Sequence, residues 1–106
     1  MATNFSYMFN SCNSLKTIST LDLSNCEDNT NMFQYCSRLE NISFVPETIK
    51  MSITIPSANL TAESIQSIID GLAIVETEQT LTLNAAIVLT DEQKTAIANK
   101  GWKLVQ

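Results

Sequence analysis

Apolar residues recur at matching positions in two blocks of the N-terminal half. Residues 8–19 read MFNSCNSLKTIS and residues 32–43 read MFQYCSRLENIS, so both share the frame Met-Phe-x-x-Cys-x-x-Leu-x-x-Ile-Ser. Ungapped recurrence at a fixed period of roughly 20–29 residues is typical of stacked repeats, in which each unit buries its apolar face against its neighbours. The frame predicts a brief helical segment around Met8 or Met32, followed by a strand near residues 21–23 or 42–44.

A longer unit repeats in the C-terminal half. Ile-Thr-Ile at 53–55 precedes Leu-Thr-Ala-Glu at 60–63, and Leu-Thr-Leu at 81–83 precedes Leu-Thr-Asp-Glu at 89–92. The alternation of apolar and polar residues around both tripeptides predicts strands with one buried face. Each unit therefore reads as strand, short loop and helix.

Capping signals mark both predicted helices. Thr61 is a good N-cap for the first. The residues after it form an apolar stripe at i, i+3, i+4 and i+7, made of Ile65, Ile68, Ile69 and Leu72. Thr90 and Gln93 fit a capping box for the second helix, Lys100 lies in its last turn, and Gly101 suits a left-handed position after it.

These patterns predict an α/β solenoid that forms a single domain over residues 1–106. Short Met-Phe-Cys-Leu repeats occupy residues 1–44. Longer strand-loop-helix repeats and a terminal strand, with Trp102 and Leu104 facing inward, occupy residues 45–106. Residues 45–50 break the rhythm and are either a loop or an extra strand.

If the strands stack, their outward positions form one stripe that a ligand would face. Its members are Asp22, Ser43, Thr54, Thr82 and Lys103. Solenoids often bind along such a strand face. The stripe lacks the Trp, Tyr and Arg side chains that dominate binding hot spots, so we expect binding that is weak per unit and multivalent. Phe9 and Phe33 belong to the repeat frame and are expected in the core, whereas Tyr35 is expected to be partly exposed on the other face.

Charge and hydropathy narrow the classes of partner. The chain has six Lys and Arg against eleven Asp and Glu, a net charge of −5, and its basic residues are scattered. Nucleic-acid binding needs basic clusters, so we predict no such partner. No apolar run reaches the roughly 18 residues of a spanning helix, and no signal peptide is visible, so we expect no membrane insertion. The chain starts within a repeat, and we expect it to be the C-terminal piece of a longer protein or a short member with an irregular first repeat.

Residue types that carry catalysis are sparse. Histidine, the commonest general base and metal ligand, is absent from the sequence. One acidic cluster consists of Asp22, Glu27 and Asp28, and Glu76 and Glu78 form a second. We interpret both as solvated loops, with a hydrolase carboxylate pair or a calcium site as the alternatives. We therefore predict no catalytic residue, no cofactor and no metal site.

The cysteines and asparagines allow two interpretations each. Cys12 and Cys36 share a repeat position, which favours burial as small apolar side chains on adjacent repeats; a disulfide, or a redox or metal role, is the alternative. Cys26 lies outside the frame and is expected to be partly exposed. The many asparagines either cap turns at the corners of the repeats or form a polar, uncharged surface for glycans.

The Met-Phe-x-x-Cys-x-x-Leu block, with Leu-Asp-Leu-Ser-Asn between its copies, resembles the BspA-like leucine-rich repeats of bacterial surface proteins and lipoproteins. That likeness covers roughly residues 3–44. Residues 60–86 and 89–105 are similar to the C-terminal part of related repeat proteins from gut bacteria and their prophages. The resemblance implies an extracellular right-handed solenoid with a parallel sheet on one face and short helices on the other. Two departures are the irregular spacing of residues 44–51 and the small number of Met-Phe repeats.

The resemblance carries no catalytic residues, and it implies adhesion to host matrix or to other bacteria, or a place on a phage tail. We therefore predict a non-enzymatic recognition or adhesion module on a bacterial surface or virion, which binds protein or glycan on a cell or matrix surface. The main alternative is a purely structural segment that caps or spaces a longer repeat array. An enzyme is the third hypothesis, and it would require a pocket with convergent polar groups.

Overall fold

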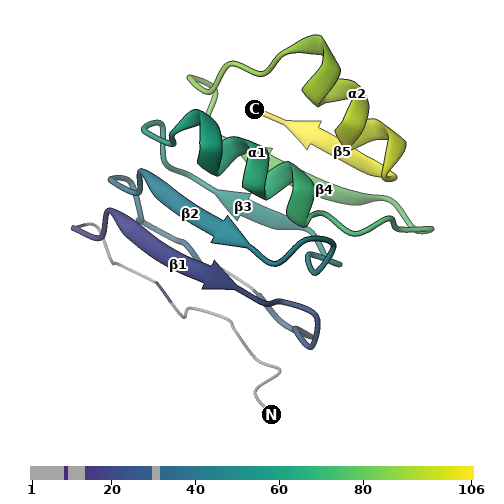
Figure 1. Cartoon of the computed structure of the whole chain (residues 1–106), viewed down its shortest axis with the longest axis horizontal. Helices are drawn as coiled ribbons and strands as arrows, with labels where there is room; N and C mark the ends of the chain where they lie inside the picture. The colour runs from purple at the N-terminus through teal and green to yellow at the C-terminus, as the bar shows by residue number, and fades with distance from the viewer. Residues whose placement is uncertain (1–8, 10–13, 30–31) are drawn as a thin grey trace.

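The computed structural model of the chain describes Phe9, residues 14–29 and residues 32–106. Within this part, strands and helices follow one another as a mixed α/β structure (Figure 1). Their order is β1 (Thr17–Leu21), β2 (Asn41–Phe44), β3 (Ile53–Ile55), α1 (Ala62–Gly71), β4 (Gln79–Leu83), α2 (Asp91–Asn99) and β5 (Trp102–Val105).

Parallel pairing joins the strands into two sheets. β1 pairs with β2, and β4 lies between β3 and β5. Thr17 pairs with Asn41 and Ile53 pairs with Leu81, so each strand lies beside the equivalent strand of the next repeat. The predicted α/β class and parallel strands are confirmed, but the expectation of one continuous sheet is wrong. In Figure 1, β1, β2, α1 and α2 succeed one another across the front, with β3 and β4 behind them.

The strands divide because α1 covers the edge of β2 that a third strand would need. The backbone N–H of Ile42 donates to the hydroxyl of Ser64 at 2.9 Å, and that of Phe44 donates to the hydroxyl of Ser67 at 3.0 Å. Two hydroxyls of the helix thus accept hydrogen bonds that a neighbouring strand would otherwise accept. Helices therefore lie in the same layer as β1 and β2, instead of forming the opposite face.

Both helices begin at the expected N-caps, and α2 ends just before the expected glycine. The Thr61 hydroxyl accepts the N–H of Ser64 at 3.2 Å, and Thr90 and Gln93 form the predicted capping box before α2. Gly101 takes the expected left-handed conformation, with φ of 90°. The apolar stripe of α1 faces the core, because Ile65, Ile68, Ile69 and Leu72 are all buried.

Lys100 stabilises a helix other than its own. It is the C-cap of α2, yet its ammonium donates to the carbonyls of Ile69 at 3.0 Å and Leu72 at 2.9 Å, at the end of α1. The Ile69 carbonyl also accepts the N–H of Leu72, and both carbonyls lie at the negative end of the α1 dipole. Lys100 thus lies one residue beyond the predicted last turn of α2, and its ammonium joins two successive units.

The repeat frame forms the core in its second copy. The frame positions of that copy are buried, namely Met32, Phe33, Cys36, Leu39 and Ile42. Cys36 is buried and Cys26 is half-buried, both as predicted. Met8 and Cys12 lie outside the described residues. One cluster of buried side chains runs from Ile18 to Trp102, so both halves of the chain share it.

Two local predictions require correction, and the alternative left open for residues 45–50 is decided. The segment after Met32 is a series of turns, not a helix, and Tyr35 has a φ of 68° that no helix accommodates. β1 ends at Leu21, because the Asp22 carboxylate accepts the N–H of Ser24 at 2.9 Å and closes a turn that ends the strand. Residues 45–50 form a turn, in which a single bridge pairs Ile49 with Leu72.

Candidate functional site

The predicted ligand-facing stripe is not continuous. Thr54 and Thr82 are opposite each other on β3 and β4, but Lys103 of β5 lies opposite Thr80, so it is offset from them. Ser43 belongs to the other sheet, and Asp22 follows the end of β1. Only two of the five predicted residues are therefore direct neighbours.

Polar side chains of β1, β2 and α1 line an open groove of about 330 Å³, which we call the β1–α1 groove. Its polar members include Thr17, Thr20, Asn41, Ser43, Glu63 and Ser67. The hydroxyls of Thr20 and Ser43 share a hydrogen bond of 2.9 Å, and that of Ser67 accepts from β2. Much of the groove's hydrogen-bonding capacity is thus already used within the fold.

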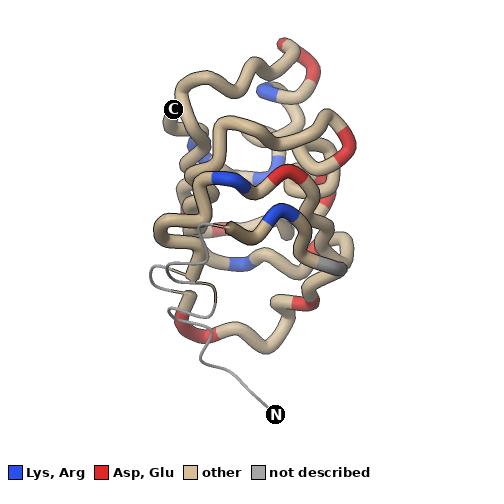
Figure 2. Tube along the Cα trace, turned by 90° about the vertical axis from the view of Figure 1, so that its left-hand side faces the viewer, with Lys and Arg blue, Asp and Glu red and all other residues tan. Residues whose placement is uncertain are grey.

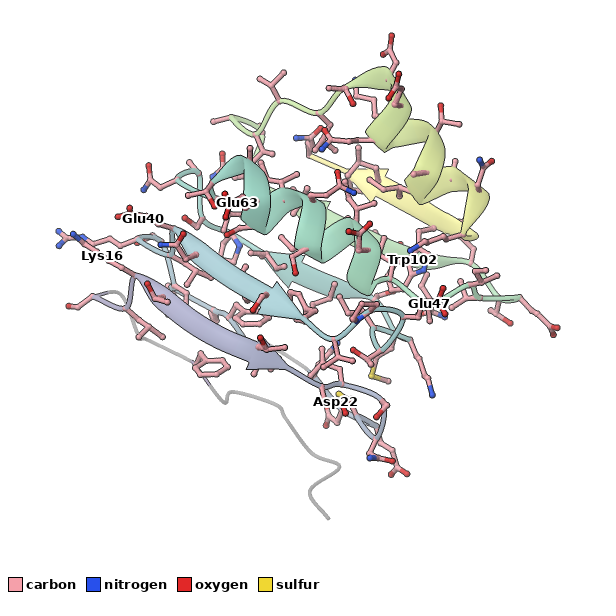
Figure 3. All side chains as sticks on the ribbon, in the orientation of Figure 1. Lys16, Asp22, Glu40, Glu47, Glu63 and Trp102 are labelled. Atoms are coloured by element: carbon pink, nitrogen blue, oxygen red, sulfur yellow. The ribbon has the colours of Figure 1, made fainter. Side chains whose placement is uncertain are left out.

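Carboxylates lie at both ends of this layer, as Figure 3 shows. Glu63 lies at the start of α1, near Glu40 and Lys16, whereas Asp22 lies at the opposite end, after β1. The sequence analysis grouped Asp22 with Glu27 and Asp28, but in the described part of the chain no three His, Cys, Asp or Glu residues are placed to hold a metal ion.

The pKa values of two side chains, Asp22 and Cys26, are shifted by their surroundings. Hydrogen bonds from the hydroxyl and backbone of Ser24 hold the pKa of Asp22 below its ordinary value of 3.8. Burial raises the pKa of the Cys26 thiol, whose Sγ lies 3.9 Å from Sδ of Met51. A raised pKa lowers the fraction of the thiol that is present as reactive thiolate, which disfavours a nucleophilic role for Cys26.

A second pocket, of about 350 Å³, opens between the turn after Met32 and strand β3. We call it the Tyr35 pocket, and its lining includes Asn29, Phe33, Tyr35, Ser52, Thr54 and Pro56. Met32 and Gln34 are the other described residues of the lining, and none of the described lining residues is charged. Tyr35 is 61% exposed, whereas Phe33 beneath it is buried. Thr54 is the member of the predicted stripe that contributes to this pocket.

Hydrogen bonds within the turn and below it fix the backbone that presents Tyr35. The N–H of Cys36 donates to the carbonyl of Phe33 at 3.0 Å, and the N–H of Ser37 donates to that of Tyr35 at 2.8 Å. Below the turn, the thiol of Cys36 donates to the Phe9 carbonyl at 2.9 Å. The rings of Phe9 and Phe33 stack with centroids 5.6 Å apart. Tyr35 is therefore an exposed ring on a fixed backbone.

Asn29, a residue of the pocket lining, carries a buried amide nitrogen without a partner. Among the described residues, its amide nitrogen is the buried side-chain polar atom that lacks a hydrogen-bond partner. A buried donor without a partner loses about 1–3 kcal/mol of hydrogen bonding, so such an atom requires an explanation.

Figure 2 shows both Lys or Arg segments and Asp or Glu segments on the stacked turns of the chain. None of the described helices is long and apolar enough to cross a membrane. Comparisons with protein-family models, curated proteins and solved structures found no match to this chain.

Sequence reasoning placed Tyr35 on an exposed face but did not recognise its pocket. One signal was available, because Tyr35 occupies a variable position of the repeat frame, where the first copy has Ser11. Tyr is enriched at binding interfaces, so a Tyr at a position that the core does not require is a candidate for contact with a partner. Thr54 of β3, which lines the same pocket, belongs to the next repeat. No local sequence pattern shows that Thr54 and Tyr35 lie together.

Proposed function

We propose that this chain is a non-enzymatic recognition or adhesion module, built as a leucine-rich-repeat-like, right-handed solenoid. The strand pairing supports the solenoid, since each ladder joins a strand to one that lies a repeat further along the chain, as when Gln79 pairs with Trp102. Contacts of the same kind continue outside the strands, where the N–H of Val75 donates to the carbonyl of Lys100 at 2.9 Å. Stacking of each unit on the next is what a solenoid requires.

The observation that carries the recognition role is the exposed Tyr35 ring over a pocket without charged side chains. Exposed aromatic rings on a fixed backbone contribute strongly to binding, because they bury much area at little cost in conformational entropy. The described residues bring no nucleophile and base together there, so the pocket fits binding better than catalysis. The resemblance to BspA-like repeats supports a place on a bacterial surface or a phage tail, with protein or glycan on a cell or matrix surface as the partner.

Binding of clustered domain to whole surfaces tests this proposal. Fluorescent, streptavidin-clustered domain is applied to mucin and matrix proteins, to epithelial cells and to a panel of gut bacteria. We expect saturable binding to at least one of them, which excess unlabelled domain reduces, because avidity amplifies weak sites. Absence of saturable binding to every surface would contradict the recognition role.

The alternative is a structural cap at the C-terminal end of a repeat array. Helix α2 favours it, because Ile97 is its only buried residue and most of its other side chains are polar. Terminal repeats need such a polar outer face to stop further stacking. Replacing the exposed Thr95 and Asn99 by leucine should then cause concentration-dependent self-association in analytical ultracentrifugation. A variant that stays monomeric would count against the capping role.

A further inference from the structure

We infer that the Tyr35 pocket is a subsite for one uncharged sugar ring of a glycan. This inference rests on the recognition role proposed above and adds a ligand class and a location to it. The volume of the Tyr35 pocket, about 350 Å³, lies at the small end of the range for ligand pockets. A pocket of this size suits a single sugar ring better than an extended peptide.

The Tyr35 ring provides the apolar contact that a sugar needs. The C–H groups on one face of a pyranose carry partial positive charge, and they stack on the negative face of an aromatic ring. Tyr35 offers such a face because it is 61% exposed, and Pro56 lies on the pocket wall. An aromatic ring flanked by hydroxyls and amides matches a ligand that has an apolar face and a hydroxylated edge.

The polar lining provides uncharged hydrogen-bonding partners. Within the described part of the chain, the Thr54 hydroxyl makes no hydrogen bond, and the Asn29 amide nitrogen has no acceptor. Sugar hydroxyls in the pocket can hydrogen-bond the exposed Thr54 hydroxyl, and they satisfy the Asn29 amide if that side chain rotates toward them. Charged ligands find no counter-charge among the lining residues, which argues against phosphorylated, sulfated or sialylated groups and against peptide termini.

The backbone at Tyr35 is strained in a way that a binding role explains. Its φ of 68° belongs to the left-handed region, where an aromatic residue is disfavoured and glycine is preferred. Glu47 has a similar φ of 62° and is also exposed, but it does not line the pocket. Strained backbone conformations cluster at ligand sites, and the strain at Tyr35 fits a binding role for its side chain.

The pair Tyr35→Gly and Glu47→Gly therefore separates binding from folding. Both variants replace a residue in the left-handed conformation by glycine and so relieve backbone strain. Both should therefore melt at the wild-type temperature or above it. Clustered proteins are applied to an array of neutral oligosaccharides with their sialylated and sulfated counterparts. We expect neutral glycans to bind the wild type, Glu47→Gly and Tyr35→Phe alike, and Tyr35→Gly to lose at least tenfold in apparent affinity. Thr54→Val, which removes one hydroxyl, should weaken the same binding less than Tyr35→Gly does.

Four outcomes would overturn the inference. Neutral binding that survives Tyr35→Gly would place the sugar elsewhere. Binding restricted to charged glycans, or competition by peptides alone, would give the pocket another ligand class. Failure on the array, with saturable binding to a cell or matrix surface retained, would reject the sugar subsite and leave the recognition role intact. Failure on the array and on every surface would reject both.

Discussion

At the scale of single residues, two exposed side chains occupy backbone positions that glycine would prefer. Tyr35 and Glu47 have φ values of 68° and 62°. Their turns are fixed by neighbours, since the N–H of Glu47 donates to the carbonyl of Asp70 at 3.0 Å and Cys36 anchors the turn of Tyr35. These contacts fix the positive φ at both positions, whichever residue type occupies them.

We expect Glu47→Gly and Tyr35→Gly each to raise the free energy of unfolding. Relief of left-handed strain is worth about 1–2 kcal/mol, and the entropy that glycine adds to the unfolded chain costs about 0.5–1 kcal/mol. The net gain should be about 0.5–1 kcal/mol, measurable by urea denaturation followed by far-UV circular dichroism. A loss of stability in both variants would show that the left-handed backbone is not strained.

Asp22 should make stability depend on pH in the acid range. Its pKa is lower in the folded protein than its ordinary value of 3.8, because Ser24 donates hydrogen bonds to the carboxylate. A lowered pKa means that the stabilisation is complete above the unfolded pKa and is lost as pH falls through the folded pKa. We expect the melting temperature to fall more steeply below about pH 4 in the wild type than in Asp22→Asn. An NMR titration midpoint for Asp22 at or above 3.8 would contradict this expectation.

At the scale of elements, helix α1 takes the place of a strand beside β2. Its serines accept the outward N–H groups of β2, and its last residue permits a close approach. A Cβ on Gly71 would lie 2.8 Å from the Cβ of Phe44, which no real packing allows. An unpaired strand edge invites association with other chains, so this arrangement also protects β2.

Ser64→Ala should destabilise the fold more than an ordinary surface substitution. The buried Ser64 hydroxyl accepts the N–H of Ile42 at 2.9 Å and donates to the carbonyl of Glu40 at 3.1 Å. Loss of that hydroxyl leaves buried backbone groups unsatisfied, which costs about 1–3 kcal/mol. Chemical denaturation of Ser64→Ala beside Ser67→Ala measures the effect. A cost at Ser64 no larger than at the half-buried Ser67 would contradict the assigned role.

At the scale of the whole molecule, one core connects units that are distant in sequence. It runs from Ile18 to Trp102, and Lys100 ties the end of α2 to the end of α1. Trp102, the single tryptophan, is buried and donates from its indole nitrogen to the Ala73 carbonyl at 2.8 Å. It therefore reports on the C-terminal units, whereas Phe33 lies in the N-terminal half.

Phe33→Ala should destabilise the whole molecule, not only its own repeat. Removing a fully buried phenylalanine costs about 3–5 kcal/mol, a large share of the stability of a small domain. We expect the urea midpoints from Trp102 fluorescence and from circular dichroism to fall together. A Trp102 transition that stays at the wild-type midpoint would show that the two halves unfold independently. If neither midpoint moves, the burial of Phe33 does not contribute to the stability of the core.

Several features followed from the sequence because their causes are local. The caps at Thr61 and Thr90 and the stripe from Ile65 to Leu72 depend on residues three or four positions apart. The burial of Cys36 followed from the repeat frame, since stacked units bury equivalent positions against their neighbours. These interactions act within one turn of helix or one repeat period, so the residue order alone specifies them.

Tertiary structure alone decided the division into two sheets and the position of the candidate site. The sequence shows where strands form, but whether β2 pairs next with a strand or with α1 depends on hydroxyls at Ser64 and Ser67, which read in the sequence as ordinary helix residues. The Tyr35 pocket likewise joins a turn of one repeat to β3 of the next. Contacts between segments this far apart arise from the packing of the folded chain, and for that reason the predicted stripe was divided and the pocket was not foreseen.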